Sequence, residues 1–168
     1  MLPYTFSALQ SDLQGFLHSV SLVSPSYYLA FRVCHAIGCR FNEVREINRW
    51  LIVDASNFSL KPQKGNNNRI LPLSKIPPEY VLMVSGQNTY FEMLRQSTAS
   101  NYFRSYYFGK RIFHEDKQLT TNLFRHHFCK RLFAEGYTPS QISTILGERV
   151  QQNTDNYIYS DLMYEARN

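Results

Sequence analysis

Four residues whose side chains suit phosphate chemistry stand in order along this chain of 168 residues. Arg40 directly follows an apolar-rich stretch, Lys64 lies in a turn rich in glycine and asparagine, and Arg125 lies within NLFRHHF. Tyr157 lies in the tail, nine residues after Glu148. A guanidinium stays charged at any working pH, and its planar fork of donors matches phosphate oxygens. Arg40 and Arg125 together would therefore neutralise the added negative charge of a pentacovalent transition state.

Each of these residues also has an ordinary interpretation. Arg40 would pair with Glu43 or Glu46 on the surface, and Lys64 would be a solvated turn lysine. The chain contains 12 tyrosines, so any one of them, Tyr157 included, is most simply a packing residue. The hypothesis therefore depends on the four residues together, and on the elements that would position them.

Most of the chain is predicted to be helical. Leu9, Leu13 and Phe16 mark one face of the first helix, where Ser7 and Gln10 have capping-box spacing. Single helices are expected over residues 6–20, 24–38, 40–47, 120–135, 138–147 and the tail 153–168. Between the third and fourth of these, a series of helices is expected to begin at residue 77 or 78 and to end near residue 108.

Proline and glycine mark several of the predicted helix ends. Pro25 and Pro139 stand in the first turns of two helices. Gly38, Gly136 and Gly147 follow the last turns of the helices over 24–38, 120–135 and 138–147. The helix over 138–147 is a clean short one, with Thr138 as its cap, Pro139 at its first position and Gly147 after it.

From Trp50 the pattern changes to short runs rich in strand-forming residues. LIVDA, NFSL and RILPL predict two or three antiparallel strands, and KGNNN between the last two is a strong turn signal. FGKRIFHEDK predicts a loop or the end of a strand. The expected fold class is therefore mostly α with a small antiparallel β-sheet (α+β), in one domain over residues 1–168.

The composition is that of a basic, globular protein. Hydrophobic residues make up 43% and charged residues 18%, and the formal net charge is +5. This charge favours a nucleic-acid partner without requiring one. Cys34, Cys39 and Cys129 are odd in number and form no CxxC pair, which argues against a disulfide scaffold or a zinc site. No secretory signal or bilayer-length apolar run is present, so we expect a cytoplasmic protein with no membrane partner.

Four segments resemble the motifs of the tyrosine recombinases, the family of phage integrases, Cre and Xer proteins. GCRFNE is similar to TGLRxSE, and KGNNNRILPL is similar to KGNKxRxVPL. NLFRHHFC is similar to HxLRHxFA, and LGERVQQNTDNY has the spacing of LGH followed by TxxY. The resemblance covers nearly the whole chain from Phe6 onward, and it implies the catalytic-domain fold of this family.

The resemblance assigns a role to each of the four residues. Arg40 and Arg125 would clamp a DNA phosphate, and Tyr157 would attack it to give a covalent 3′-phosphotyrosine and a free 5′-hydroxyl. A phenol has an ordinary pKa of about 10, so it needs nearby cations that favour the phenolate. Lys64 would protonate the departing 5′ oxygen. Tyr159 is the alternative nucleophile.

Further basic residues are expected on the DNA. Lys61 lies on the same hairpin as Lys64 and is the alternative general acid, while Arg69 and Arg149 are expected to contact the DNA backbone. A covalent protein intermediate conserves the energy of the phosphodiester, so the resemblance implies neither a metal ion nor a nucleotide cofactor. No carboxylate cluster in the sequence suggests a magnesium site.

Two positions depart from the motifs of the family. Asn122 replaces the first histidine of HxxR, and it retains a donor for a phosphate oxygen. Glu148 replaces a histidine or tryptophan, and an ionised carboxylate would repel a phosphate. Three interpretations of Glu148 are open: it is protonated beside the phosphate, it turns away to pair with Arg149, or the enzyme is slow or inactive. His126 and His127 are candidate compensating donors, although the first is more often structural and the second more often solvated.

The chain is also short for this family, whose members usually carry an N-terminal helical domain that clamps the other face of DNA. We therefore expect either an excised catalytic domain or a naturally minimal protein, in both cases without the N-terminal core-binding domain. The tail over about 158–168, with the apolar residues Leu162, Met163 and Tyr164, is expected to dock in cis or on a neighbouring protomer.

The expected function is site-specific recombination or integration of double-stranded DNA. The family works as a tetramer on two duplexes, so self-association on DNA is expected, with a monomer possible in its absence. Two alternatives stay open: a type IB topoisomerase-like activity, and a catalytically impaired DNA-binding or accessory protein on a recombinase scaffold.

Overall fold

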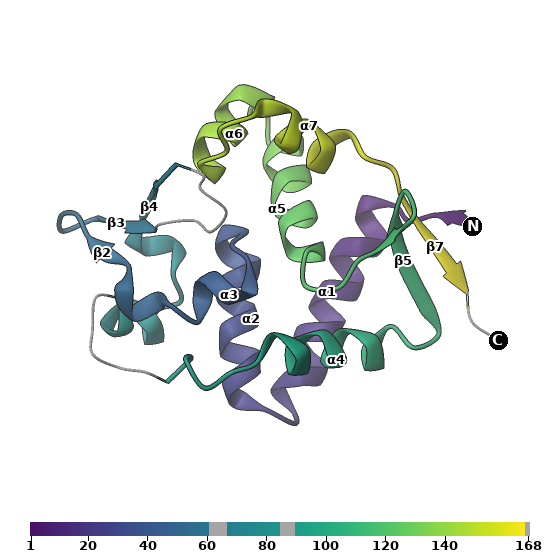
Figure 1. Ribbon diagram of the computed structural model, residues 1–168, viewed down its shortest axis with the longest axis horizontal. Coiled ribbons are helices and arrows are strands. Elements are labelled where there is room, and N and C mark those ends of the chain that lie inside the picture. Colours follow the sequence, from purple (N-terminus) through teal and green to yellow (C-terminus); the bar gives the residue numbers. More distant parts are fainter. Residues whose placement is uncertain (61–66, 85–89, 167–168) are drawn as a thin grey trace.

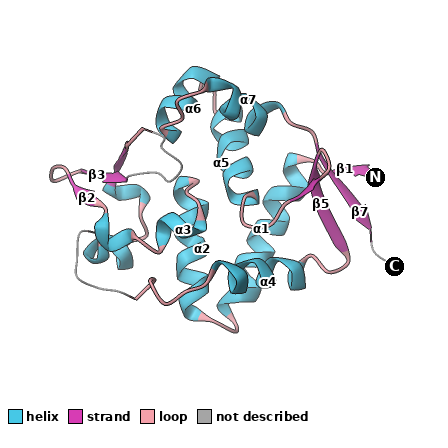
Figure 2. Cartoon of the chain, in the orientation of Figure 1, coloured by secondary structure: helices cyan, strands magenta, loops and turns pink. Residues whose placement is uncertain are grey.

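Helices make up most of the computed structural model (Figure 1), which describes residues 1–60, 67–84 and 90–166. The α-helices are α1 (Phe6–Ser21), α2 (Pro25–Ile37), α3 (Phe41–Val44), α4 (Gln96–Tyr106), α5 (Leu123–Ala134), α6 (Pro139–Leu146) and α7 (Gln151–Tyr159). Short 3-10 helices cover Ile47–Arg49, Leu73–Lys75 and Pro78–Met83. The mostly helical class with small antiparallel sheets, predicted from the sequence, is confirmed (Figure 2).

The predicted helix ends agree with the structure at most positions. Ser24 caps α2, and Gly38 ends it in the left-handed conformation, with φ +67°. Thr138 and Gln141 form a capping box at the start of α6. The capping prediction for the first helix was wrong, because the side chain of Thr5, not Ser7, accepts from a main-chain N–H of the first turn. The chain enters α1 two residues earlier than the capping-box spacing suggested.

Two of the predicted helices are shorter or more irregular than expected. The stretch over 40–47 forms α3 and then runs into the 3-10 helix Ile47–Arg49. The segment that opens at Pro78 forms a 3-10 helix rather than an α-helix.

The structure contains two antiparallel sheets where the sequence predicted one. The predicted sheet has the order β2-β3-β4 (Leu51–Ile52, Asn57–Leu60 and Arg69–Pro72). The second has the order β1-β7-β5-β6, and its strands are Leu2–Pro3, Leu162–Ala166, Lys110–His114 and Lys117–Gln118. It joins both ends of the chain to the middle, and these distant pairings leave little trace in a local sequence window.

The tail is therefore not helical throughout, and the prediction of a helix over 153–168 was wrong beyond Tyr159. After α7, Ser160 turns to an extended conformation, and β7 pairs with β5 of the same chain and with β1. Main-chain groups of β5 that would otherwise lie at a sheet edge are satisfied by this pairing. The apolar residues Leu162 and Tyr164 thus dock in cis.

Helix α5 lies at the centre of the fold (Figure 1) and contacts α1, α2, α6 and α7. Residues 123–129 are all buried, so the helix has no solvated face along this stretch. On its apolar side, Phe124 packs in an aromatic cluster with Phe16, Phe31 and Phe103. A helix buried on all sides also carries its polar residues inside the protein, and this places Arg125.

Two expectations about the chain as a whole are addressed by the described residues. None of the helices among them is long and apolar enough to cross a membrane. Cys34, Cys39 and Cys129 are all free and buried.

Candidate active site

A pocket of about 340 Å³ lies where α3, α5, α7 and the β5–β6 hairpin meet. Most of its polar side chains are hydrogen-bond donors, and it also contains one glutamate. The lining residues are Arg40, His114, Lys117, Leu119, Asn122, His126, Glu148, Asn153, Asn156 and Tyr157. Segments more than a hundred residues apart in the sequence thus contribute to a single site.

Arg40 reaches this pocket from the start of α3. Gly38 ends α2, and the Arg40 main-chain N–H donates to the Glu43 carboxylate at 2.6 Å, which fixes the backbone at this junction. The Nη1 atom of Arg40 is buried and has no hydrogen-bond partner within residues 1–60, 67–84 and 90–166. Glu46 pairs with Arg49 at 3.5 Å. Arg40 therefore keeps donor capacity toward the pocket.

Arg125 projects from the first turns of α5 and is 1% exposed. One guanidinium nitrogen, Nη1, donates to the carbonyl of Gly38 at 3.1 Å, and Nη2 donates to the Glu148 carboxylate at 3.2 Å. The guanidinium carbon lies 5.6 Å from the centre of the Tyr157 ring. Asn122, one turn earlier, lines the pocket itself. Arg125 is thus placed against the tyrosine but lies behind Glu148.

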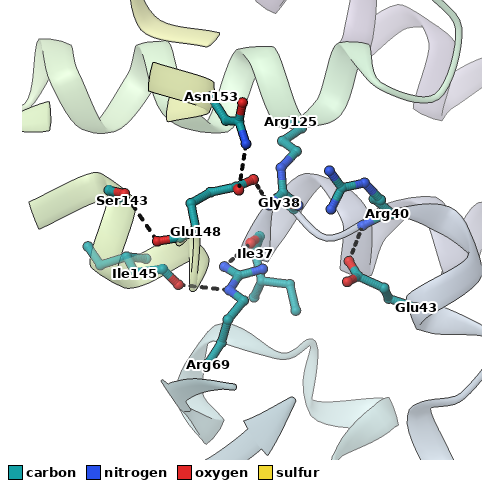
Figure 3. A network of polar contacts seen from close by, with 10 residues as sticks. All are labelled: Ile37, Gly38, Arg40, Glu43, Arg69, Arg125, Ser143, Ile145, Glu148 and Asn153. Atoms are coloured by element: carbon teal, nitrogen blue, oxygen red, sulfur yellow. Dashed lines mark hydrogen bonds and ion pairs between the residues drawn. The ribbon is translucent and has the colours of Figure 1, made fainter. Parts of the chain in front are cut away.

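Glu148 follows α6 and is held at several atoms (Figure 3). Its main-chain N–H donates to the Ser143 carbonyl at 3.0 Å, and Asn153 donates to its carboxylate at 3.4 Å. The carboxylate pairs with Arg125, and both side chains are almost fully buried. The expected pairing with Arg149 is therefore replaced by a pairing with Arg125, the second arginine of the predicted clamp.

The two candidate nucleophiles lie in different surroundings. Tyr157 is half-buried and lines the pocket, where the His126 ring packs edge-on against it at 4.9 Å between centroids. Tyr159 is 58% exposed, and its ring packs against Phe133 outside the pocket. The two tyrosines are two residues apart on one helix, so they point in different directions.

Both histidines that follow Arg125 are buried. Burial lowers the pKa of His126 to about 3 and that of His127 to about 4, and neighbouring positive charges add to both effects. The expectation that His127 is solvated was wrong, because its ring stacks between Phe6 and His35. The prediction assumed that one face of this helix is exposed at His127, whereas α5 is buried on all sides there.

The chain resembles known proteins in its fold rather than in its sequence. No protein-family model and no curated protein matches the chain. XerH site-specific recombinase, bound to a palindromic difH substrate, superposes with a TM-score of 0.57 at 16% identity, over 88% of this chain and 47% of that chain. XerA recombinase superposes with a TM-score of 0.57 at 20% identity, over 89% and 58%. The Tn1549 transposon integrase, in complex with transposon right end DNA, gives 0.54 at 19%, over 86% and 58%.

The fold is that of the tyrosine recombinases. The predicted resemblance is thereby confirmed at the level of the fold. The chain spans about half the length of these solved chains. Sequence identity of 16–20% shows a shared backbone arrangement and assigns no role to an individual residue.

In the sequence, Lys61 and Lys64 stand between β3 and β4. Both lysines lie outside the described residues. Asn67, three residues after Lys64 in the sequence, has its main-chain N–H bonded to the Gly147 carbonyl at 2.8 Å. The segment therefore re-enters the described structure beside Glu148.

Arg69 does not have the surroundings expected of a DNA contact in the recombinase fold. It is 1% exposed, and its guanidinium donates to the carbonyls of Ile145 at 2.7 Å and Ile37 at 2.6 Å. Burial, together with the charge of Arg125, lowers its pKa to about 10. Arg69 thus joins the carboxyl-terminal ends of α2 and α6, where carbonyls lack helical partners. Arg149 is exposed, as a DNA contact requires.

Sequence reasoning missed several residues of the pocket. His114 and Lys117 come from the β5–β6 hairpin, which the sequence indicated only as a loop or a strand end. Asn153 and Asn156 come from α7, within the variable spacer before Tyr157. The turn of this hairpin is Glu115–Asp116, which lacks the Asn-Gly or other glycine-containing pair that marks such a turn in a sequence. Among the described residues, no group of three or more His, Cys, Asp and Glu side chains is arranged to hold a metal ion.

Proposed function

We propose that this chain is the catalytic domain of a site-specific DNA recombinase or integrase that cleaves and rejoins double-stranded DNA through Tyr157. One observation carries the proposal: Arg40 and Tyr157 line the same pocket, and the Arg125 guanidinium lies against the Tyr157 ring. The pocket occurs on the fold of XerH and XerA, whose names describe recombinases.

In the proposed reaction, a phosphodiester enters the pocket and its nonbridging oxygens accept hydrogen bonds from Arg40 and Arg125. The Tyr157 hydroxyl releases its proton to water as its oxygen bonds to phosphorus, and the bond from phosphorus to the 5′ oxygen breaks. The product is a 3′-phosphotyrosine and a 5′-hydroxyl strand end. Both arginines stabilise the charge that accumulates on phosphorus oxygens in the transition state. Asn122 supplies a further donor at the rim.

Lys64 is proposed as the general acid that protonates the departing 5′ oxygen, with Lys61 as the alternative. The support is the β3–β4 connection, whose return at Asn67 is bonded beside Glu148. Attack of the 5′-hydroxyl of another strand on the phosphotyrosine reverses the chemistry and joins the strands. The phosphodiester energy is retained in the tyrosine ester, so the proposed reaction needs neither nucleotide nor metal ion.

The proposed partner is double-stranded DNA. In support, XerH was solved bound to a palindromic difH substrate, and the Tn1549 integrase in complex with transposon right end DNA. Arg149 is exposed next to the pocket and is proposed to contact the DNA backbone, together with Lys61. Strand exchange between two duplexes requires four cleavages, which favours a tetramer on DNA. Contacts to phosphates release counterions, so binding is expected to weaken steeply with salt.

A second candidate function is favoured by one specific observation. The Arg125 guanidinium is already neutralised by Glu148 in the free protein. A chain in which this pair never opens would bind DNA without cleaving it, as an accessory protein on a recombinase scaffold. A type IB topoisomerase-like activity shares the cleavage chemistry, and it differs in rejoining the original strand rather than a second duplex.

The test is covalent trapping in the presence of a chelator. Wild type, Tyr157→Phe and Tyr159→Phe are incubated with nicked duplexes of randomised sequence, denatured and separated on a gel. The proposal expects an adduct in wild type and in Tyr159→Phe, and none in Tyr157→Phe. The phenylalanine keeps the ring that packs on His126, so the fold of the pocket is retained.

The other outcomes separate the candidates. An adduct that persists in Tyr157→Phe and disappears in Tyr159→Phe would move the nucleophile to Tyr159. DNA binding without any adduct would support the accessory protein. Exchange of strands between two labelled duplexes would separate a recombinase from a topoisomerase-like enzyme.

A further inference from the structure

The hairpin between β5 and β6 places two basic side chains at the pocket. His114 and Lys117 are the last cross-strand pair of the hairpin, joined by the two residues Glu115 and Asp116. Glu115 has φ +54°, the left-handed conformation that a turn of this length requires. Directly paired residues of antiparallel strands have neighbouring side chains. Both His114 and Lys117 line the pocket that holds Tyr157.

Ring contacts connect this hairpin to the nucleophile. The His114 ring lies 5.5 Å from the His126 ring, and the His126 ring lies 4.9 Å from that of Tyr157. The positive charges of Lys117 and His114 also contribute to the lowered pKa of His126. The hairpin is thus packed against the active-site helices rather than held apart from them.

Lys117 lines the pocket and, unlike Lys110 and Lys130, has its ammonium group uncommitted within the described residues. Lys110, on the neighbouring strand, pairs with Asp12 at 3.1 Å. Lys130 donates to the carbonyls of Ile158 and Ser160. Lys117 is exposed, and across the described part of the chain no carboxylate lies within ion-pair distance of it.

The charges at the pocket suggest what Lys117 does. Glu148 stands where the recombinase motif has a histidine or tryptophan, and its carboxylate cancels the charge of Arg125. Of the two arginines of the proposed clamp, Arg125 is thus offset by a carboxylate, while the phosphate gains negative charge during the reaction. A second cation at the pocket wall offsets the carboxylate, and the flexible stem of lysine allows its ammonium group to reach a phosphate oxygen.

We propose that Lys117 is a phosphate-contacting residue of this site, and that it supplies from the β5–β6 hairpin the donor that the Glu148 position lacks. His114 is a positioning residue, since its ring holds the hairpin against His126. The inference rests on the proposed function, and it adds a residue that lies outside every motif of the resemblance.

The test is DNA affinity measured across salt concentrations. Lys117→Met and Lys117→Arg are compared with wild type for binding of a fluorescent duplex between about 50 and 200 mM salt. Loss of one phosphate contact should reduce the slope of log affinity against log salt by about 0.9. Lys117→Met should also bind about three- to tenfold more weakly, and Lys117→Arg should retain most of the affinity and the slope.

Lys75→Met is the matched control, because Lys75 is an exposed lysine outside the pocket and its loss changes the net charge equally. Equal affinity and slope in Lys117→Met and Lys75→Met would overturn the inference while leaving the proposed function intact. A wild-type protein that binds no duplex at low salt would overturn the proposed function, and the inference with it. Circular dichroism of each variant confirms that the compared proteins are folded.

Discussion

The carboxylate of Glu148 lies 3.2 Å from the Arg125 guanidinium, and both side chains are almost completely buried. A buried ion pair contributes little net stability, but removing one partner is costly because the other charge is then buried without a partner. In the proposed reaction, a phosphate oxygen would take the place of the Glu148 carboxylate on Arg125. In the free protein, the Glu148 carboxylate therefore occupies the donor of Arg125 that a phosphate would use. The stronger this ion pair is, the weaker phosphate binding at Arg125 should be.

Glu148→Gln should weaken the fold and strengthen DNA binding. The amide oxygen of glutamine still accepts from Arg125, so we expect a loss of only about 2 kcal/mol in the free energy of unfolding. The released positive charge should raise duplex affinity about tenfold. Inorganic phosphate should stabilise the variant against heat more than it stabilises wild type, because it binds the folded site.

Glu135→Gln is the control for this change of charge. Glu135 pairs with Arg131 on the surface of α5 at 3.9 Å, and its carboxylate is about half exposed. Its loss should change the free energy of unfolding by no more than about 0.5 kcal/mol. A gain in DNA affinity that is equal in the two variants would show that net charge, not the release of Arg125, is responsible.

Arg69→Met should destabilise the protein by about 3 kcal/mol. The methionine keeps an apolar stem, but the carbonyls of Ile37 and Ile145 lose a charged donor inside the protein. Arg104→Met, at an exposed position of α4, is the matched control and should have little effect. Urea denaturation of both variants checks the prediction. An equal, small effect would contradict the structural role of Arg69.

The buried histidines predict a loss of stability in acid. The pKa of His126 is lowered to about 3 and that of His127 to about 4, while an unfolded histidine has a pKa near 6.5. Between these values the unfolded state binds more protons, so the stabilisation present above about pH 6.5 is lost as the pH falls. Each histidine should contribute up to about 1.4 kcal/mol per pH unit in this window.

Denaturant midpoints at pH 7 and pH 5 measure this effect. His127→Phe keeps a ring between Phe6 and His35, and it should reduce the difference between the two midpoints. His18→Gln, which removes an exposed histidine, is the matched control. A pH dependence that is the same in all three proteins would show that other groups cause it.

Gly147→Ala should disturb the site more than Gly136→Ala. Both glycines have positive φ, so alanine is strained at either position by about 1 kcal/mol. At Gly147, a Cβ atom would also lie 2.3 Å from the Asn67 carbonyl oxygen, whereas nothing lies within 4 Å at Gly136. Gly147→Ala should therefore cost about 3 kcal/mol and weaken DNA binding. Equal destabilisation would contradict close packing of the hairpin return against Glu148.

The sequence by itself determined most of the helices, the β2-β3-β4 sheet and the order of the motif residues. These features follow from local signals: apolar periodicity, proline and glycine at helix ends, and a turn flanked by strand-forming residues. The motifs also indicated Arg40, Arg125 and Tyr157. In the structure Arg40 and Tyr157 line one pocket, and the Arg125 guanidinium lies against the Tyr157 ring. The helix predicted for the end of the tail shows the limit, since β7 forms only because β5 is there to receive it.

Only the tertiary structure decided what each polar side chain faces. Arg69 and Arg149 are both arginines near motif positions, yet one is buried against helix ends and the other is exposed. The partner of Glu148 is Arg125, 23 residues away, and Lys117 reaches the pocket through a hairpin outside every motif. The physical reason is that burial, charge pairing and pocket walls depend on elements distant in sequence, whereas residue type and spacing record only local geometry.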